Sequence, residues 1–265
     1  MKKKNGVLIR IYRFFLFFGF NPLVLINNLN GIRFYLHDFF EIKKQKGFDD
    51  KFSFGPNYPI LSERYSDSGT VSGQYFHQDL FVARRIFQNK PIRHIDIGSR
   101  IDGFVAHVAV FREIEVLDIR NQVSKVKNIL FKKADLMILP EDMLNSCDSI
   151  SSLHAIEHFG LGRYGDPIDY NGYLKAITNI TKILKVDGKF YFSVPIGKQR
   201  IEFNAHRVFS VKYLIALLKE NFRIESFSYI NDRGDFFENI ELNQLQILNN
   251  YGCHYGCGIF ELTKI

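Results

Sequence analysis

The 265-residue sequence has no tryptophan and only three cysteines. Cys147, Cys253 and Cys257 are too few and too unevenly spaced for a disulfide framework, and no two form a CxxC pair. His254 lies between the last two cysteines, but a fourth ligand at the spacing of a zinc site is missing. The sequence therefore predicts a reducing compartment, no bound metal, and Cys253 and Cys257 buried near the last strand.

The sequence also lacks an unbroken apolar run long enough to cross a membrane. Residues 7–29 are rich in Phe, Leu and Ile, but Arg10 and Arg13 interrupt them early. Asn21 and Pro22 then break the run before it reaches the roughly 20 residues of a spanning helix. The pattern predicts a helix over residues 8–18, a turn, and a second helix toward Phe40. We expect this arm, residues 1–53, to pack on the rest of the chain, on a second copy in an oligomer, or on a membrane interface.

Negative charge is in modest deficit, which leaves a formal net charge of +7. An excess of this size is usually a solvated surface, but part of it precedes and enters the apolar segment. That arrangement favours a membrane surface over nucleic acid, so no nucleic-acid partner is expected. Hydrophobic residues make up 46% of the chain and charged residues 24%, which excludes intrinsic disorder and predicts one folded domain over residues 54–265.

From Arg93 onward, short apolar strands alternate with helical stretches. This alternation is typical of βαβ units and a parallel sheet, whose ligands bind at the carboxyl ends of the strands. Pro195 is expected to end the strand over residues 189–194, which a turn over residues 185–188 opens. The expected strands cover residues 94–97, 115–118, 148–153, 189–194, 223–229 and 258–263.

The GxGxxG loop of dinucleotide-binding folds is also missing. Gly98 nevertheless follows the first strand and lets the turn pass close to a ligand, and Asp118 ends the second strand, where a carboxylate accepts ribose hydroxyls. Arg100 and Asp102 stand where glycines would be needed. Asp96 and Asp102 would repel a pyrophosphate but suit the cationic amino group and sulfonium of S-adenosylmethionine. NAD is therefore the weaker candidate.

Further polar residues lie where an adenosine cofactor would bind. Asp135 is positioned to take the adenine amino group while Leu136 covers the ring, although an aspartate there caps a turn about as often. The helix expected over residues 75–88 carries Tyr75, His77, Gln78 and Asp79 in its first turn, where these polar residues either close over a ligand or cap the helix. The predicted cofactor-binding residues are Asp96, Gly98, Ser99, Asp118, Ile119, Asp135, Leu136 and His154.

The segment after the strand over residues 148–153 carries the candidate catalytic groups. A hydroxyl acceptor must lose its proton, and His158 and His206 are candidate bases because imidazole has a neutral form near pH 7. Glu157 is placed to orient His158 or to bind an acceptor hydroxyl. A hydrogen-bonded structural role is as frequent for either histidine. The spacing of His154 and His158 also occurs in metal sites, but the glutamate does not follow the first histidine as in HExxH.

A glycine-flanked loop and a later segment offer groups for a polar acceptor. Such loops suit sugar hydroxyls or a phosphate, because glycines allow close approach and the side chains between them supply donors and acceptors. The predicted substrate-binding residues are Arg163, Tyr164 and Asp166 on the loop, with Asn204 and Arg207 facing them.

Residues 152–166, with Asp96-Ile-Gly-Ser99 upstream and residues 203–209 downstream, resemble the family called domain of unknown function 268. The resemblance extends from about Tyr75 to the C-terminus. That family is similar to class I S-adenosylmethionine-dependent methyltransferases, and its bacterial members are often found with surface-polysaccharide genes.

The resemblance implies an α/β, Rossmann-like fold with a mostly parallel seven-stranded sheet, helices on both faces and the last strand inserted antiparallel. It also implies a cytoplasmic methyltransferase, peripheral at the inner face of the membrane, that acts on a sugar or another small glycan precursor. The alternatives are an NAD or sugar-nucleotide enzyme and a catalytically degenerate scaffold in glycan assembly.

Overall fold

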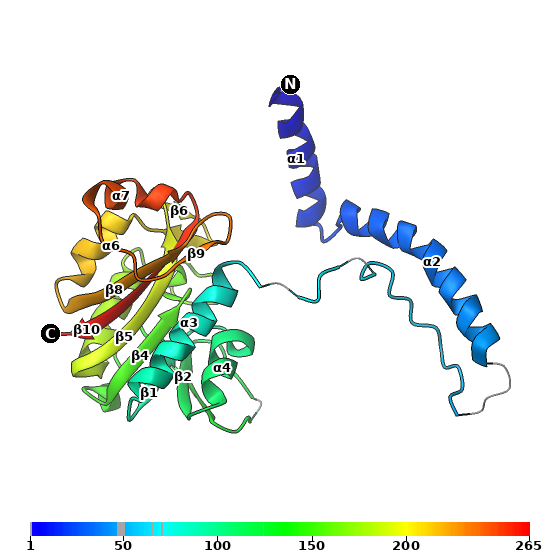
Figure 1. Cartoon of the computed structure of the whole chain (residues 1–265). Coiled ribbons are helices and arrows are strands. Elements are labelled where there is room, and N and C mark those ends of the chain that lie inside the picture. The colour runs from blue at the N-terminus through cyan, green and yellow to red at the C-terminus, as the bar shows by residue number, and fades with distance from the viewer. Residues whose placement is uncertain (1, 47–50, 65, 70, 124) are drawn as a thin grey trace. The chain divides into compact units, whose positions relative to one another are not determined.

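The computed structural model describes residues 2–46, 51–64, 66–69, 71–123 and 125–265, and it divides the chain into two units, residues 1–70 and residues 71–265 (Figure 1). The sequence placed this boundary after residue 53. Residues beyond that point contact the second helix of the arm, because Arg64 donates a hydrogen bond to Asp38 at 2.6 Å and the Leu61 carbonyl lies against Gly31. The first unit therefore extends further than its apolar pattern indicated.

The first unit contains the two predicted helices, α1 (Lys2–Phe17) and α2 (Pro22–Lys46). Asn21 caps α2, because its side-chain oxygen accepts hydrogen bonds from the backbone N–H groups of Leu23 at 3.1 Å and Val24 at 3.4 Å. Among the described residues, neither helix alone has the length and apolarity to cross a membrane. The pair formed by residues 8–17 and α2 meets these criteria jointly, with a bend of 83° between them.

The second unit is built on one sheet with the predicted Rossmann-like topology. Its strand order is β3-β2-β1-β4-β5-β10-β8-β9; β1 pairs in parallel with β2 and β4, and β10 runs antiparallel between β5 and β8. The sheet has eight strands rather than seven, because a two-residue strand pairs with the edge of β8. The strands are β1 (His94–Ile97), β2 (Ile114–Asp118), β3 (Ile129–Lys133), β4 (Cys147–Leu153), β5 (Leu184–Ile196), β8 (Phe222–Ile230), β9 (Phe236–Phe237) and β10 (Gly256–Lys264).

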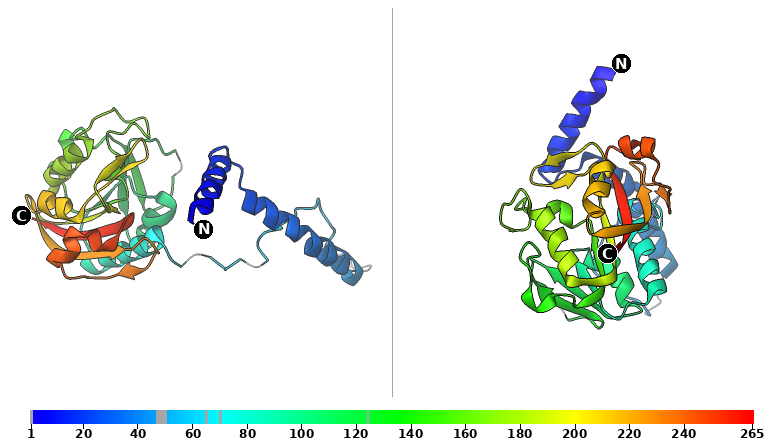
Figure 2. Two further views of the ribbon diagram at one scale, coloured as in Figure 1. Left: turned by 90° about the horizontal axis from the view of Figure 1, so that it is seen from above. Right: turned by 90° about the vertical axis from the view of Figure 1, so that its left-hand side faces the viewer.

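Helices cover both faces of this sheet (Figures 1 and 2). Side chains alternate along β5, so Tyr191 joins the core with α3 and α4 while Phe190 and Phe192 join the opposite core with α5 and α6. A separate hairpin, β6 (Arg200–Glu202) and β7 (His206–Val208), follows β5. The helices are α3 (Gln74–Asn89), α4 (Ala106–Ala109), α5 (Gly172–Ile183), α6 (Val211–Leu218) and α7 (Gln244–Leu248), with a π-helical turn over Ile101–Val105 and 3-10 turns over Glu141–Met143, Ile156–His158 and Asn250–Gly252.

The expected limits of the fifth strand were wrong at both ends. β5 begins at Leu184 and runs through the expected turn, with Asp187 at a φ of 61° and an irregular register against β4. It also continues past Pro195, which lies opposite Cys257 of β10. A proline interrupts a strand where a neighbouring strand needs a hydrogen bond from its N–H group. The carbonyl of Pro195 is still available, and it accepts a hydrogen bond from the Phe209 N–H at 2.9 Å.

The three cysteines are free and buried. As predicted, two of them lie near the last strand: Cys253 just before β10 and Cys257 within it. Burial raises the pKa of Cys147 and Cys253 to about 12, so these thiols stay protonated at neutral pH. In the described parts of the chain, no three His, Cys, Asp or Glu residues are grouped as a metal site would require.

Candidate functional site

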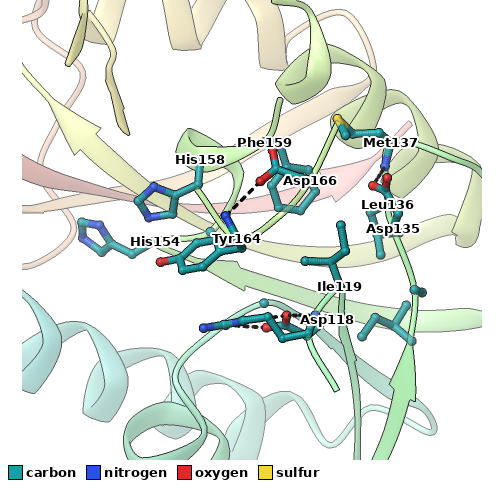
Figure 3. A pocket seen from close by; sticks show the side chains of 15 residues that line it. Asp118, Ile119, Asp135, Leu136, Met137, His154, His158, Phe159, Tyr164 and Asp166 are labelled. Atoms are coloured by element: carbon teal, nitrogen blue, oxygen red, sulfur yellow. Dashed lines mark hydrogen bonds and ion pairs between the residues drawn. The ribbon is translucent and has the colours of Figure 1, made fainter. Parts of the chain in front are cut away.

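Two adjoining cavities open at the carboxyl ends of β1, β2 and β4, where a parallel sheet places its ligand site. Figure 3 shows the smaller of the two. The small cavity measures about 50 Å³ and the large cavity about 620 Å³. The residues that line only the small cavity include Ile119, Asp135, Leu136, Met137 and Phe159. Those that line only the large cavity include Tyr75, Arg100, Glu157, Arg163, His206 and Tyr255. Both are lined by Gly98, Asp118, Arg120, His154, His158 and Tyr164.

The turn after β1 borders both cavities and is fixed by hydrogen bonds to Asp96. Gly98 has a φ of 68°, and a Cβ there would come within 3.0 Å of the Ala155 Cβ. The Asp96 carboxylate accepts hydrogen bonds from the Ser99 and Ser151 hydroxyls, both at 2.6 Å, and from the Ser99 N–H at 3.0 Å. Burial raises the pKa of Asp96 to about 6, against the effect of these donors. Asp96 lines neither cavity, so it supports the turn while Gly98 and Ser99 face the site.

Asp118 ends β2 as predicted, and Arg120 occupies its carboxylate. One oxygen accepts hydrogen bonds from the Arg120 backbone N–H at 2.8 Å and from Nε at 3.0 Å, and the other accepts from Nη2 at 2.6 Å. The guanidinium also lies over the Tyr164 ring, 4.4 Å from its centroid. Because Arg120 and Tyr164 line both cavities, this pair stands where the small cavity meets the large one.

Asp135 and Leu136 follow β3 and line the small cavity together with Ile119 (Figure 3). Asp135 caps its own turn, because its Oδ1 accepts a hydrogen bond from the Met137 N–H at 2.9 Å. The Leu136 carbonyl is fixed from α5 by the side-chain amide of Asn179 at 2.9 Å. The capping role and the cavity position, which the sequence left as alternatives, therefore occur together at Asp135.

A buried ion pair lies at the end of β4. His154 Nδ1 is 3.0 Å from Glu157 Oε1, and both side chains are almost fully buried. Burial opposes both charges, but Cys257 and Glu157 raise the pKa of His154 well above its usual value, and His154 lowers the pKa of Glu157. His154 Nε2 and Glu157 Oε2 have no hydrogen-bond partner among the residues that the structure describes. A buried donor and acceptor without partners are costly, and a ligand that carries both charges would satisfy the two atoms.

His158 has the geometry of a proton acceptor. Its Nδ1 lies 2.6 Å from the Ala205 carbonyl, which can only accept, so the proton of the neutral ring is on Nδ1 and the lone pair is on Nε2. Burial lowers the pKa of His158 below its usual value and keeps the ring neutral at pH 7. Nε2 lies 3.6 Å from Glu157 Oε1, which stabilises the imidazolium once a proton is taken up.

The β6–β7 hairpin brings the second histidine to the large cavity. His206 Nε2 lies 3.1 Å from Glu202 Oε2, and its ring centroid is 4.9 Å from Tyr255 and 6.4 Å from His158. Asn204, in the turn of the same hairpin, lines neither cavity. Of this segment, His206 lines the large cavity as predicted, and the Ala205 carbonyl contacts His158.

The loop over residues 160–166 is organised by Asp166. Its carboxylate accepts hydrogen bonds from the N–H groups of Gly160 at 2.8 Å, Gly162 at 3.1 Å and Tyr164 at 3.1 Å. Asp166 lines the small cavity, and this internal use of its oxygens makes it a support for the loop. Arg163 extends toward the hairpin, donates to the Ala205 carbonyl at 3.0 Å and lines the large cavity with Tyr164.

Arg207, predicted as a substrate contact, is a buried side chain that connects two loops through hydrogen bonds to their carbonyls. Its side chain lines neither cavity and donates to the carbonyls of Phe159 at 2.6 Å and Tyr170 at 3.0 Å. The guanidinium also lies 4.9 Å from the centroid of the Tyr173 ring. The sequence showed a polar residue opposite the loop, but the need of two partly buried carbonyls for a donor becomes visible only in three dimensions.

Several residues of the site were missed by the sequence analysis. Arg120, two positions after the predicted ribose-binding aspartate, and Tyr255 were not assigned a role. Tyr75 reaches the large cavity and lies 5.2 Å from His154, measured between ring centroids. Gln78 in the same helix is buried instead and donates to Asp79 at 3.0 Å.

Comparisons with known proteins agree with this architecture. The [4+2]-cyclase SpnF superposes with a TM-score of 0.52 at 16% identity, over 75% of this chain and 85% of that one. The 1,6-didemethyltoxoflavin-N1-methyltransferase of Burkholderia thailandensis, solved with 1,6-didemethyltoxoflavin and S-adenosylhomocysteine, gives 0.51 at 14% identity, over 71% and 78%. No curated protein matches the sequence.

These structures establish the Rossmann-like fold of class I methyltransferases, while their different reactions show that the fold alone does not fix the chemistry. A family model described as "Caenorhabditis protein of unknown function, DUF268" matches residues 104–251, more than half of the chain. The motifs at residues 152–166 and 203–209 lie inside this match. The protein therefore belongs to the DUF268 family.

Proposed function

We propose that the protein is an S-adenosylmethionine-dependent methyltransferase that acts on a hydroxyl of a sugar or surface-polysaccharide precursor, in the cytoplasm at the inner face of the membrane. The observation that carries the proposal is the buried pair with two unpartnered atoms, His154 Nε2 and Glu157 Oε2, beside the Gly98 turn. A cationic donor and an anionic acceptor side by side match the carboxylate and ammonium of an amino acid such as the methionyl part of this cofactor.

The remaining cofactor contacts follow from the cavity lining. The Asp118 carboxylate is positioned for ribose hydroxyls, and Asp135 with the apolar side chains of Ile119 and Leu136 is positioned for adenine. The methyltransferase of similar fold contains S-adenosylhomocysteine, which supports this choice over NAD. The cofactor, when bound, supplies a methyl group already activated by its sulfonium, so the protein's task is to orient the acceptor and remove its proton.

His158 is the proposed base. Its Nε2 accepts the acceptor's hydroxyl proton, and Glu157, 3.6 Å away, stabilises the resulting imidazolium. The Ala205 carbonyl holds the ring in the tautomer that leaves Nε2 free. His206 borders the same cavity and is positioned to bind the acceptor or to serve as the alternative base.

The lining of the large cavity supports a polar acceptor. Arg163 has no carboxylate partner among the residues that the structure describes, and it stands beside Tyr164 in the wall. A guanidinium in this position pairs with a phosphate or with vicinal hydroxyls, both of which occur in activated sugars. A volume of about 620 Å³ is within the roughly 300–1,000 Å³ of small-molecule sites.

The test is formation of S-adenosylhomocysteine in the presence of nucleotide sugars and an isoprenoid-phosphate-linked sugar. The proposal predicts turnover with at least one of these acceptors, and a loss of 10²-fold or more in His158→Ala with unchanged binding of S-adenosylhomocysteine. His107→Ala, which removes an imidazole outside both cavities, is the matched control. Unchanged turnover in His158→Ala would contradict its role as a base, and activity only on acceptors without a sugar would overturn the acceptor class.

A further inference from the structure

The positive charge of the protein is concentrated in its two N-terminal helices. Residues 1–46 contain nine Lys and Arg and only two Asp and Glu, a net charge of +7 that equals the charge of the whole chain. The remaining 219 residues are therefore neutral as a set. The first acidic residue is Asp38. A charge imbalance confined to one segment indicates that the segment meets an anionic partner.

The same helices expose a large apolar surface at the bend that joins them. Residues 14–32 contain no charged side chain, while Arg10 and Arg13 precede them and Arg33 follows. Within this unit the apolar side chains at the bend are open to solvent, and Phe17 is 85% exposed. The exposed apolar residues of the bend are Phe14, Phe15, Leu16, Phe17, Phe18, Phe20, Leu23, Val24, Leu25 and Ile26. A contiguous patch of this kind marks a binding surface.

Several backbone N–H groups at the bend are paired within the bend itself. The Phe15 carbonyl accepts hydrogen bonds from Phe18 N–H at 3.2 Å and Phe20 N–H at 3.0 Å, and the Leu16 carbonyl accepts from Gly19 N–H at 3.0 Å. On the other side of the bend, Asn21 caps the start of α2 through its side-chain oxygen. Each N–H group paired in this way lowers the cost of moving the bend into the apolar part of a membrane interface.

We propose that the α1–α2 bend, residues 14–26, inserts into the interfacial region of an anionic lipid bilayer, with Arg10, Arg13 and Arg33 at the headgroups. The apolar tip flanked by guanidinium groups matches the layered polarity of a membrane surface. A second copy of the chain offers the same positive segment, and residues 47–265 carry no compensating negative excess. A bilayer with acidic lipids therefore fits this surface better than either protein partner.

The first experiment uses the absence of tryptophan from the sequence. Phe17→Trp in the full-length protein places the only indole at the bend, and Ile92→Trp places one at a 90% exposed position in the second unit. We expect the Phe17→Trp emission to shift to the blue on addition of vesicles containing phosphatidylglycerol, and brominated lipids to quench it. Ile92→Trp should change in neither respect.

The second experiment separates charge from apolar insertion by vesicle co-sedimentation. Arg10→Glu/Arg13→Glu should weaken binding to phosphatidylglycerol vesicles at least tenfold, because each basic residue near the surface contributes about fivefold. The control Lys212→Glu/Lys219→Glu makes the same charge change on exposed positions of the second unit and should leave binding intact.

Three results would overturn the proposal: binding that does not depend on the anionic lipid, a blue-shifted Phe17→Trp emission without vesicles that reports packing on protein, or a dimer in lipid-free solution that buries the indole. None of these measurements uses the cofactor, so the outcome is independent of the proposed methyl transfer.

Discussion

Removing Arg120 should strengthen cofactor binding, because this side chain occupies the Asp118 carboxylate that we propose binds the ribose. Both Asp118 oxygens accept hydrogen bonds from the Arg120 side chain, at 3.0 and 2.6 Å. The guanidinium is also stacked 4.4 Å from the centroid of the Tyr164 ring. A ligand that binds Asp118 through its hydroxyls must displace both contacts.

The magnitude follows from the exposure of the pair. The Arg120 side chain is 52% exposed, so its ion pair is worth at most about 1 kcal/mol after solvent screening. The contact with the Tyr164 ring adds about 0.5–1 kcal/mol. Losing about 1–2 kcal/mol of competition corresponds to a roughly fivefold to thirtyfold gain in affinity.

The assay is calorimetric titration of Arg120→Ala with S-adenosylhomocysteine. Arg84→Ala is the matched control, since Arg84 also pairs with a carboxylate, Glu238 at 2.8 Å, and lies 5.6 Å from the Phe81 ring centroid, outside both cavities. The control should bind like the wild type. A loss of affinity in Arg120→Ala would refute the reasoning and show that the guanidinium contacts the cofactor directly.

Three further predictions concern the turn, the base and Arg207. Gly98→Val should abolish binding of S-adenosylhomocysteine, because the site lacks room for a side chain; Gly252→Val, with a similar φ of 73° but open space around it, should bind normally in the same titration. Burial lowers the pKa of His158 below the usual value of about 6.5, so the ring remains neutral to a lower pH. The turnover rate should therefore fall on the acid side only below pH 6.5. A fall that begins above pH 6.5 would contradict this. Arg207→Ala should lower the free energy of unfolding by about 2–4 kcal/mol in urea titrations, because the buried guanidinium is lost and two partly buried carbonyls lose their donor; a change below 1 kcal/mol would show that Arg207 does not stabilise this region.

The parallel sheet and the edge at which the candidate site lies were predictable from local patterns. Apolar strands alternating with helices fix a parallel sheet, and the residue after each strand then lies at one edge, which is why Gly98, Asp118 and Asp135 converge there. The antiparallel insertion of β10 came from the family resemblance and is confirmed. These features depend on periodicity and chain direction, which the sequence shows directly.

The roles of charged residues were harder to predict, because they depend on partners distant in the chain. Asp96 meets Ser151 from the neighbouring strand, and Arg207 meets carbonyls 37 and 48 positions away. Arg120 folds back on Asp118 and at the same time lies over the ring of Tyr164, which belongs to another loop. A sequence shows that such side chains are polar but does not show whether they face a ligand or the protein itself.

The most direct test of the account is titration of the purified full-length protein with S-adenosylmethionine and S-adenosylhomocysteine, with NAD and a nucleotide sugar as competitors. The unpartnered atoms of His154 and Glu157 and the carboxylate of Asp118 predict micromolar binding of the first two ligands and none of NAD, with Asp118→Ala losing that affinity. Binding of NAD in their place, or wild-type affinity in Asp118→Ala, would contradict the assignment of this cavity.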